Sequence, residues 1–539
     1  MLEERHDSGP SDARPDPRSS PQDIAASAAV DEAAAATNAG ETGLAATAPW
    51  SAWRDRPTWL IAVAVLGAYL VISLYRLWTL TPTSWDLGIF TEYVKDYAHL
   101  QAPIVDVRGP GFDLLGDHFQ VIVALIAPFF RLFPSPATLL IAQAVLTAVS
   151  VFPVVQAGSA LLGRGAGRAI GFAYGFSWGL QQMIDFDFHE IAFAVPLLAF
   201  CLSALLRGRA RAALWWALPL VLVKEDQGFT VAAIGVVMWL AGVRATRGAP
   251  GGALSRIAGD AFGGAFLFCW GLAWSLLEIT VIIPHFSPTH HYLYWNLGGV
   301  VGGGPAFSSV GLLQQVGHAY PVKLQTLALL LLPTAFIALG SPVAAIVVPS
   351  LLLRFIATNS SYWGTLYHYN ATAMPILFLA AIEAMSRWRE ASAVGGAGGG
   401  TVREKWEIVK GGAARHGAAM MLAISVPLAF QFPLSDLWNG QTYEISPGVA
   451  ADQAAMAVVP SGATVTATLT LLAPLGARCD TFWIGNSGNP ATQYIVFDNP
   501  NSGYSPAITN VPQFIAQLYP HADYQQVFFE DGVYVFKRG

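Results

Sequence analysis

Apolar segments that are long enough to enter a bilayer recur along most of this sequence, and they constrain its fold more than any other feature. The eleven candidate membrane helices are 59–80, 137–162, 168–184, 190–206, 210–223, 227–243, 261–283, 323–339, 342–357, 372–387 and 416–432. A spanning helix needs about 20 apolar residues, so several segments are near the lower limit. Only 12% of the residues are charged, whereas a soluble domain has about 25%. We therefore expect a polytopic α-helical membrane protein.

The charge balance excludes several other classes of protein. The chain has 29 Lys and Arg against 35 Asp and Glu, which gives a net charge of −6. A nucleic-acid binder needs a basic footprint for phosphate, and none is present. Three cysteines in 539 residues make no disulfide framework. The composition therefore predicts a protein of the lipid bilayer, with no nucleic-acid partner.

Arginine-rich connections predict which side of the membrane each loop faces. They contain Arg164 and Arg168, then Arg207 to Arg211, Arg244 to Arg256, and Arg387 to Arg415. Such connections occur at every second turn, as the positive-inside rule expects of cytoplasmic loops, with the uncharged turn 340–341 as the exception. Residues 119–133 are too short for a span, and counting them would reverse this pattern, so we interpret them as re-entrant or juxtamembrane.

The two ends of the sequence differ from its apolar middle. Residues 1–58 are rich in Ala, Pro, Ser and Asp and predict a disordered cytoplasmic tail, while 59–432 form the membrane domain. Residues 433–539 contain short strand-like runs at 463–468, 494–497, 526–529 and 533–536, and an amphipathic stretch at 511–518. They predict a small extracytoplasmic α/β domain, with the N-terminus in the cytoplasm and the protein in the plasma membrane.

Polar and ionisable residues gather in the loops that this orientation places outside. Every histidine except His6 and His416 falls there. Ionisable groups are costly in a bilayer, so their concentration on one face indicates a site, although polar residues also simply end helices at the headgroups. Asp86, in the motif 85–90, can act as a general base toward an acceptor hydroxyl, or can be a solvated helix terminus.

Two further motifs combine acids with histidines. In 116–119, His118 can position a sugar or phosphate, whereas Asp117 can cap the following helix. In 185–190, Asp185, Asp187 and His189 alternate, so an extended chain would place them on one face. Their carboxylates would suit Mg²⁺ or Mn²⁺. The alternative is a polar turn in which Glu190 lies near a helix N-terminus.

Cations and aromatic residues complete the outer set. Lys224 can neutralise a lipid phosphate or pair with Glu225 or Asp226. Arg354, in the apolar run 351–356, needs an anion such as a polyprenyl phosphate, or a route to snorkel to the surface. The aromatic loop 360–370 contains His368 and suits either a sugar face or an interfacial aromatic belt.

These motifs resemble a known family when they are taken in order. Residues 86–90, 117–119, 187–190 and 224–226, with the ending 529–534, are similar to motifs of the bacterial membrane family called domain of unknown function 2079. The resemblance covers about residues 59–539. That family resembles the GT-C glycosyltransferases, which are polytopic enzymes that use lipid-phosphate sugar donors at the outer membrane face.

The resemblance implies a GT-C-like membrane domain and a role for several residues. Asp86 matches the catalytic aspartate of the first outer loop. Asp185 and Asp187 resemble a second acidic motif, which binds metal in relatives with pyrophosphate donors. Arg354 is placed like a ligand of the donor phosphate, without a short motif to anchor the match.

The leading hypothesis from sequence is a glycosyltransferase that moves a sugar from a polyprenyl-phosphate donor to a cell-envelope glycan or protein acceptor. Asp86 would activate the acceptor, and Arg354 with Lys224 would hold the phosphate. His118 and His189 would orient the sugar, and His368 would bind substrate beside them. The alternative is a polytopic transporter or a lipid-binding scaffold without catalysis, although the sequence shows no clear inverted repeat.

Overall fold

The computed structural model describes residues 50–81, 85–247, 254, 257, 259–292, 294, 314–394, 402–446, 448–504 and 507–539. Residues 55–539 form one compact unit. Most of the predicted tail, residues 1–49, and the glycine-rich segment 395–400 lie outside the described residues. The first membrane helix begins at Arg56, three residues before the predicted start, because the Asp55 side chain accepts a hydrogen bond from the Thr58 backbone N–H.

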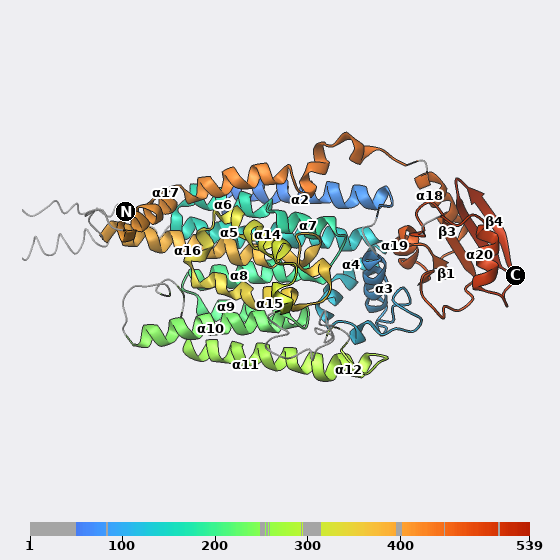
Figure 1. Ribbon diagram of the computed structural model, residues 1–539, viewed down its shortest axis with the longest axis horizontal. Coiled ribbons are helices and arrows are strands. Elements are labelled where there is room, and N and C mark those ends of the chain that lie inside the picture. The colour runs from blue at the N-terminus through green and yellow to red at the C-terminus, as the bar shows by residue number, and fades with distance from the viewer. Residues whose placement is uncertain are drawn as a thin grey trace, which may run out of the picture. The chain divides into compact units, whose positions relative to one another are not determined.

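Helices make up most of the described chain before residue 430 (Figure 1). Their bounds are α2 (Arg56–Trp78), α3 (Asp86–Ala98), α4 (Ala127–Leu132), α5 (Pro136–Leu162), α6 (Arg164–Gly175), α7 (Trp178–Asp185), α8 (Ala194–Leu206), α9 (Ala210–Ala217), α10 (Gln227–Thr246), α11 (Ala261–Leu277), α12 (Ile283–Phe286), α14 (Tyr320–Leu331), α15 (Val348–Ile356), α16 (Ala373–Val394) and α17 (Val402–Ala429).

Four helical segments of the described chain are long and apolar enough to cross a membrane. They are Arg56–Trp78, Pro136–Leu162, Gln227–Thr246 and Ala261–Phe286. Shorter apolar helices occupy Val121–Leu132, Glu190–Leu206, Ala210–Leu222 and Pro342–Ile356. The polytopic helical class is therefore confirmed, while the count of eleven spans stays a prediction.

Several predicted spans are interrupted helices rather than continuous ones. The segment 168–184 divides into α6 and α7. In the segment 323–339, α14 ends at Leu331 and two short 3₁₀ helices follow it. Between them, Ala335 and Phe336 have positive φ angles of 50° and 60°. Residues 119–133 form a 3₁₀ turn, Val121–Ile126, followed by the short α4, which suits a segment that does not span. At each interruption a turn leaves backbone N–H and C=O groups outside the helical hydrogen-bond pattern, so these polar groups lie within the helical domain.

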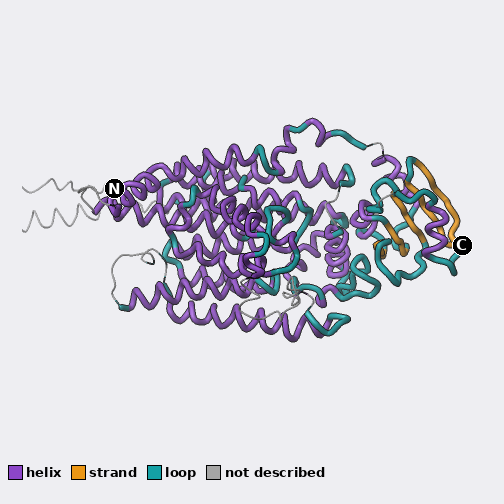
Figure 2. Tube along the Cα trace, viewed as in Figure 1, coloured by secondary structure: helices purple, strands orange, loops and turns teal. Residues whose placement is uncertain are grey.

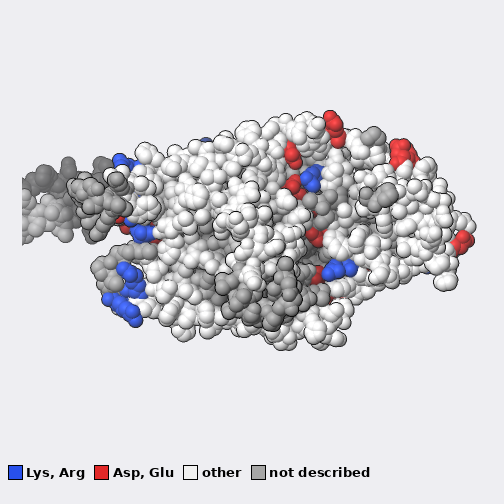
Figure 3. Space-filling model, viewed as in Figure 1, with Lys and Arg blue, Asp and Glu red and all other residues white. Residues whose placement is uncertain are grey.

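The surface of the helical domain is apolar over its middle. Figure 3 shows one group of charged side chains at the left end of the view and another right of its centre, with few charged side chains between them. Large apolar side chains remain exposed on α2 and α11, including Leu60 at 71% and Phe262 at 84%. Apolar patches of this extent mark a surface that contacts lipid.

Helices α10 and α11 approach each other unusually closely. A Cβ atom on Gly228 would overlap the carbonyl oxygen of Gly271, and one on Gly235 would overlap the backbone of Gly264 and Phe268. Small residues at a membrane helix interface allow such an approach, because lipid gives helices no hydrophobic reason to associate. This contact fixes the start of α10 against α11.

The C-terminal domain contains the strands of the described chain (Figure 2). Its elements are α18 (Gly448–Val458), β1 (Thr464–Ala467), α19 (Leu472–Gly476), β2 (Asp480–Trp483), β3 (Tyr494–Asp498), α20 (Val511–Leu518), β4 (Tyr524–Glu530) and β5 (Val533–Arg538). The sheet order is β2-β1-β3-β5-β4, with β1 parallel to β2 and β3. Strands β3, β5 and β4 pair antiparallel. Four strands and α20 coincide with predicted segments, whereas β2 was not predicted from the sequence.

The glycine contact between α10 and α11 can be tested by filling it. We expect Gly235→Leu to lower the free energy of unfolding by about 1–3 kcal/mol, because the added side chain must separate two touching backbones. Chemical denaturation in detergent measures the change. Val236→Leu is the matched control, since Val236 is exposed and tolerates added volume. An equal effect of both substitutions would contradict the close contact.

Candidate functional site

The predicted site residues come from five separate segments that meet around His368. These segments are the start of α3, the turn before residue 119, the turn after α7, the turn before α10 and the loop between α15 and α16. Burial lowers the pKa of His368 well below its usual value, and His189, Lys224, Arg354 and His118 lower it further. Charges act in this way only over short distances, so these residues share one polar region.

Asp86 lies beside two stacked histidines. It is the first residue of α3, and its Oδ2 atom is 3.4 Å from His189 Nε2. The rings of His189 and His368 stack with their centroids 3.9 Å apart. The Nδ1 atoms of both rings are buried and have no hydrogen-bond partner among the described residues. Such atoms are expected to bind something that the protein alone does not supply.

Glu225 fixes the position of His118. Its Oε1 atom is 2.7 Å from His118 Nδ1 and also accepts a hydrogen bond from the Tyr292 hydroxyl at 2.7 Å. Burial raises the pKa of Glu225, but His118 and the hydrogen bonds outweigh burial and lower this pKa to about 2. Glu225 is therefore an anion that orients the imidazole ring, while Tyr294 stacks on that ring at 4.4 Å.

The predicted capping role of Asp117 is wrong. Asp117 lies 3.3 Å from Arg108 Nε and accepts a hydrogen bond from the Tyr294 hydroxyl at 3.0 Å. The following 3₁₀ helix starts after Gln120 and has no side-chain cap. Asp117 is recruited by residues that are distant in sequence, which a capping pattern does not reveal.

Lys224, which is partly exposed, forms an ion pair at 2.9 Å with the buried Glu190. The predicted direct pairing of Lys224 with Glu225 or Asp226 is therefore wrong, because its partner comes from the turn after α7. Glu190 is the first residue of a 3₁₀ helix, Glu190–Phe193, as the polar-turn interpretation expected. Lys224 has three N–H donors and gives one of them to Glu190.

Arg354 holds the loop that contains His368. Its guanidinium donates to the carbonyl oxygens of Tyr362, Gly364 and Tyr369 and to Asn370 Oδ1, at 2.9 to 3.3 Å. The side chain is buried, so it does not snorkel. Most of its N–H donors are thus occupied by the loop, and its role as a phosphate ligand stays a prediction.

Comparison with known proteins places this arrangement in a family. The family described as predicted membrane protein (DUF2079) matches residues 76–535. The chain belongs to this family. No curated protein matches the sequence.

Solved structures show a related fold. ArnT from Cupriavidus metallidurans bound to undecaprenyl phosphate is 12% identical, with a TM-score of 0.51, covering 88% of this chain and 97% of that chain. The apo state of the same ArnT is 12% identical over the same shares of both chains, with a TM-score of 0.44. The apo oligosaccharyltransferase of Archaeoglobus fulgidus is 13% identical, with a TM-score of 0.33, covering 79% of this chain and 65% of that chain. The likeness to the ArnT complex supports the predicted GT-C-like fold.

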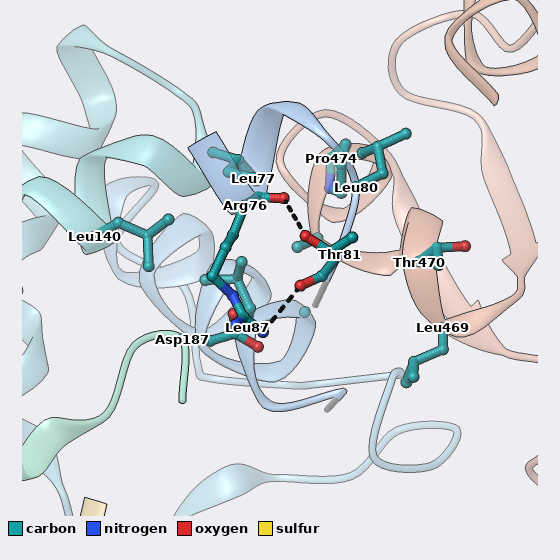
Figure 4. Close-up of a pocket in the computed structure, with 12 residues that line it drawn as sticks. Arg76, Leu77, Leu80, Thr81, Leu87, Leu140, Asp187, Leu469, Thr470 and Pro474 are labelled. Carbon is teal, nitrogen blue, oxygen red and sulfur yellow. Dashed lines mark hydrogen bonds between the residues drawn. The ribbon is translucent and has the colours of Figure 1, made fainter. Parts of the chain in front are cut away.

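The alternation of Asp185 and Asp187 predicted that they would share one face. In this DUF2079 protein they do not. Asp187 has a φ angle of 56°, so the chain turns between Asp185 and His189 instead of extending. Asp185 contacts Arg76 at 2.6 Å, and Asp187 lines a small pocket with Arg76 and Thr470 (Figure 4). No group of three His, Cys, Asp or Glu residues in the described chain is arranged to hold a metal ion. The two carboxylates offer an incomplete ligand set, and their binding of Mg²⁺ or Mn²⁺ stays a prediction.

Glu278 is a buried acid near the site that does not belong to any of the sequence motifs. Glu278 lies in a π-helical turn, Glu278–Ile282, and both its carboxyl oxygens are buried without a hydrogen-bond partner among the described residues. One helical turn earlier, the Ser275 hydroxyl donates to the carbonyl oxygen of Glu225 at 2.5 Å. The sequence could have indicated this residue, because Glu278 is the one acid in the predicted span 261–283 and acids are rare in membrane helices.

The ion pair of Lys224 and Glu190 gives a stability test. We expect Lys224→Met to lower the free energy of unfolding by about 3–5 kcal/mol, since it leaves Glu190 buried without its partner. The double variant Lys224→Met with Glu190→Gln should lose less. Lys410→Met is the control, because Lys410 pairs with the exposed Glu407 and such pairs contribute about 0–1 kcal/mol. Denaturation in detergent compares them, and equal losses in the single and double variants would contradict the pairing.

Proposed function

We propose that this protein is a membrane glycosyltransferase that moves a sugar from a polyprenyl-phosphate donor to a cell-envelope glycan or protein acceptor at the outer face. The observation that carries the proposal is that the Asp86 carboxylate lies 3.4 Å from His189, whose ring stacks on His368, with the Lys224 ammonium close enough to lower the pKa of His368. A fold shared with ArnT, whose structure contains undecaprenyl phosphate, supports a lipid-linked donor.

Asp86 is the proposed general base. Its side chain is 26% exposed, so an acceptor hydroxyl can reach it, while the nearby His189 is almost fully buried. The acceptor oxygen would bond to the anomeric carbon of the sugar as its proton passes to the Asp86 carboxylate. The bond from that carbon to the phosphate oxygen breaks, and its electron pair leaves with the polyprenyl phosphate.

Lys224 is the proposed electrostatic partner of the leaving phosphate. Its ammonium group keeps N–H donors beyond the one that binds Glu190, and it is 18% exposed. A preorganised cation stabilises charge that develops on a leaving group in a site with little water. Arg354 would add positive potential while it orders the loop 362–370.

The histidines are the proposed sugar ligands. The unpartnered Nδ1 atoms of His189 and His368 can each exchange a hydrogen bond with a sugar hydroxyl. Phe186 stacks on both rings, with centroid distances of 4.8 and 5.8 Å, and keeps them parallel. His118, oriented by Glu225, would contact the sugar or its phosphate from another wall.

Substitution of Asp86 tests the chemistry. Asp86→Asn keeps the side-chain size but removes the base, so we expect a folded protein whose transfer rate falls at least about 100-fold. Polyprenyl-phosphate sugars extracted from native membranes serve as donors, and the label transferred to cell-envelope material is measured. Glu444→Gln, which changes an exposed acid, is the control. Full transfer by Asp86→Asn, or no transfer by the folded wild type, would favour the transporter or scaffold alternative.

The orientation of the chain is tested by cysteine labelling. In a Cys269→Ser background, Gln525→Cys in the C-terminal domain should react with a membrane-impermeant maleimide in intact cells. Arg209→Cys, in an arginine-rich loop, should react only after the cells are permeabilised. Labelling of both positions from one side, or in the opposite order, would place the proposed site on the wrong face.

A further inference from the structure

The C-terminal domain contacts α3 along most of its length. A Cβ atom on Gly88 would lie 2.9 Å from Leu472 Cβ, so α19 lies directly against the helix. At the start of α3, the rings of Trp85 and Trp483 meet edge to face with centroids 4.6 Å apart. Near its end, Lys95 Nζ donates to the carbonyl oxygen of Cys479 at 2.6 Å. The helix that begins with Asp86 is therefore held by the soluble domain.

Glu92 lies at the centre of this contact. The residue is only 2% exposed. Its two carboxyl oxygens accept hydrogen bonds from two different segments. Oε1 accepts a hydrogen bond from the backbone N–H of Thr481 in β2 at 2.8 Å. Oε2 accepts one from the backbone N–H of Val107 at 3.1 Å. One buried carboxyl thus joins α3, the loop before residue 113 and the C-terminal sheet.

The Thr481 hydroxyl takes no part in this contact, because its Oγ1 atom is buried and has no hydrogen-bond partner among the described residues. Gly476, the last residue of α19, packs against Glu92 instead: a Cβ atom on Gly476 would lie 3.4 Å from Glu92 Cγ.

We propose that Glu92 is a positioning residue: the hydrogen bonds that its buried carboxyl group accepts from the backbone N–H groups of Thr481 and Val107 lock the C-terminal domain onto α3 and so fix Asp86. The lock itself stands on the contacts of Glu92 and Thr481. Its consequence for catalysis rests on the proposed function of Asp86.

The charges around Glu92 agree with a neutral acid. Lys95 on the same helix, Asp106 on the adjoining loop and Asp480 beside β2 are the charged groups of the described chain around this contact, and Asp96 follows on α3. Burial raises the pKa of Glu92 to about 8, although Lys95 and the two backbone donors act to lower it. A carboxyl whose pKa is raised on folding stabilises the folded state below that pKa. This stabilisation is lost as the pH rises from about 4.5 toward 8.

Substitution of Glu92 tests the lock. In the full-length protein in detergent at pH 6.5, Glu92→Leu should speed amide hydrogen exchange in residues 99–113 and 480–483 about tenfold, because it removes both acceptor oxygens. Glu92→Gln keeps one acceptor oxygen and should restore part of the protection. Protection equal to wild type in Glu92→Leu, or exchange in Glu92→Gln as fast as in Glu92→Leu, would overturn the proposal.

Titration of the melting temperature provides a second measurement. Between pH 6 and 9 the wild-type melting temperature should fall more steeply than that of Glu92→Gln, which cannot ionise. Asp480→Asn is the matched control on the same strand and should keep the wild-type slope. Equal slopes for wild type and Glu92→Gln would contradict a proton held by Glu92.

These readouts separate the lock from the proposed reaction, because neither measures sugar transfer. If both hold, Glu92→Leu should lower kcat in the transfer assay while KM changes little, since Asp86 loses its alignment but the donor site keeps its contacts. Altered exchange with unchanged kcat would retain the lock and refute its link to Asp86. Unaltered exchange would refute the lock whatever the transfer rate.

Discussion

The requirement that charge within a bilayer protein be paired organises this molecule. Lys224 and Glu190 satisfy each other, and in doing so they tie the turn after α7 to the start of α10. Next to them, Glu225 holds His118. A buried charge that lost its partner would be costly, so these pairs fix the relative position of turns that the chain itself separates widely.

Close helix packing supports these pairs without contributing charge. The glycines of α10 and α11 bring the two backbones into contact, which places Ser275 against the carbonyl oxygen of Glu225. Arg354 has a comparable role between α15 and α16, where it donates hydrogen bonds to the carbonyl oxygens of the loop that contains His368. Both contacts order polar groups by means of the backbone.

The C-terminal sheet is part of the same arrangement. Its β2 strand and α19 lie against α3, and α3 begins with the carboxylate to which we assign the role of base. The C-terminal sheet thus packs against the helix that carries Asp86. It does so through Glu92, a group that periodicity could not single out, because an acid in an amphipathic helix usually faces water.

The sequence by itself determined the apolar helices, the order of the polar motifs and most strands of the C-terminal sheet. Each of these depends on residues close together in the chain, where hydropathy and spacing are informative. The tertiary structure decided the partners. Lys224 bonds to Glu190 rather than to its own neighbours, Asp117 to Tyr294 rather than to a helix end, and Asp185 to Arg76. Pairs so distant along the chain leave no local pattern, because only folding brings their charges within reach of each other.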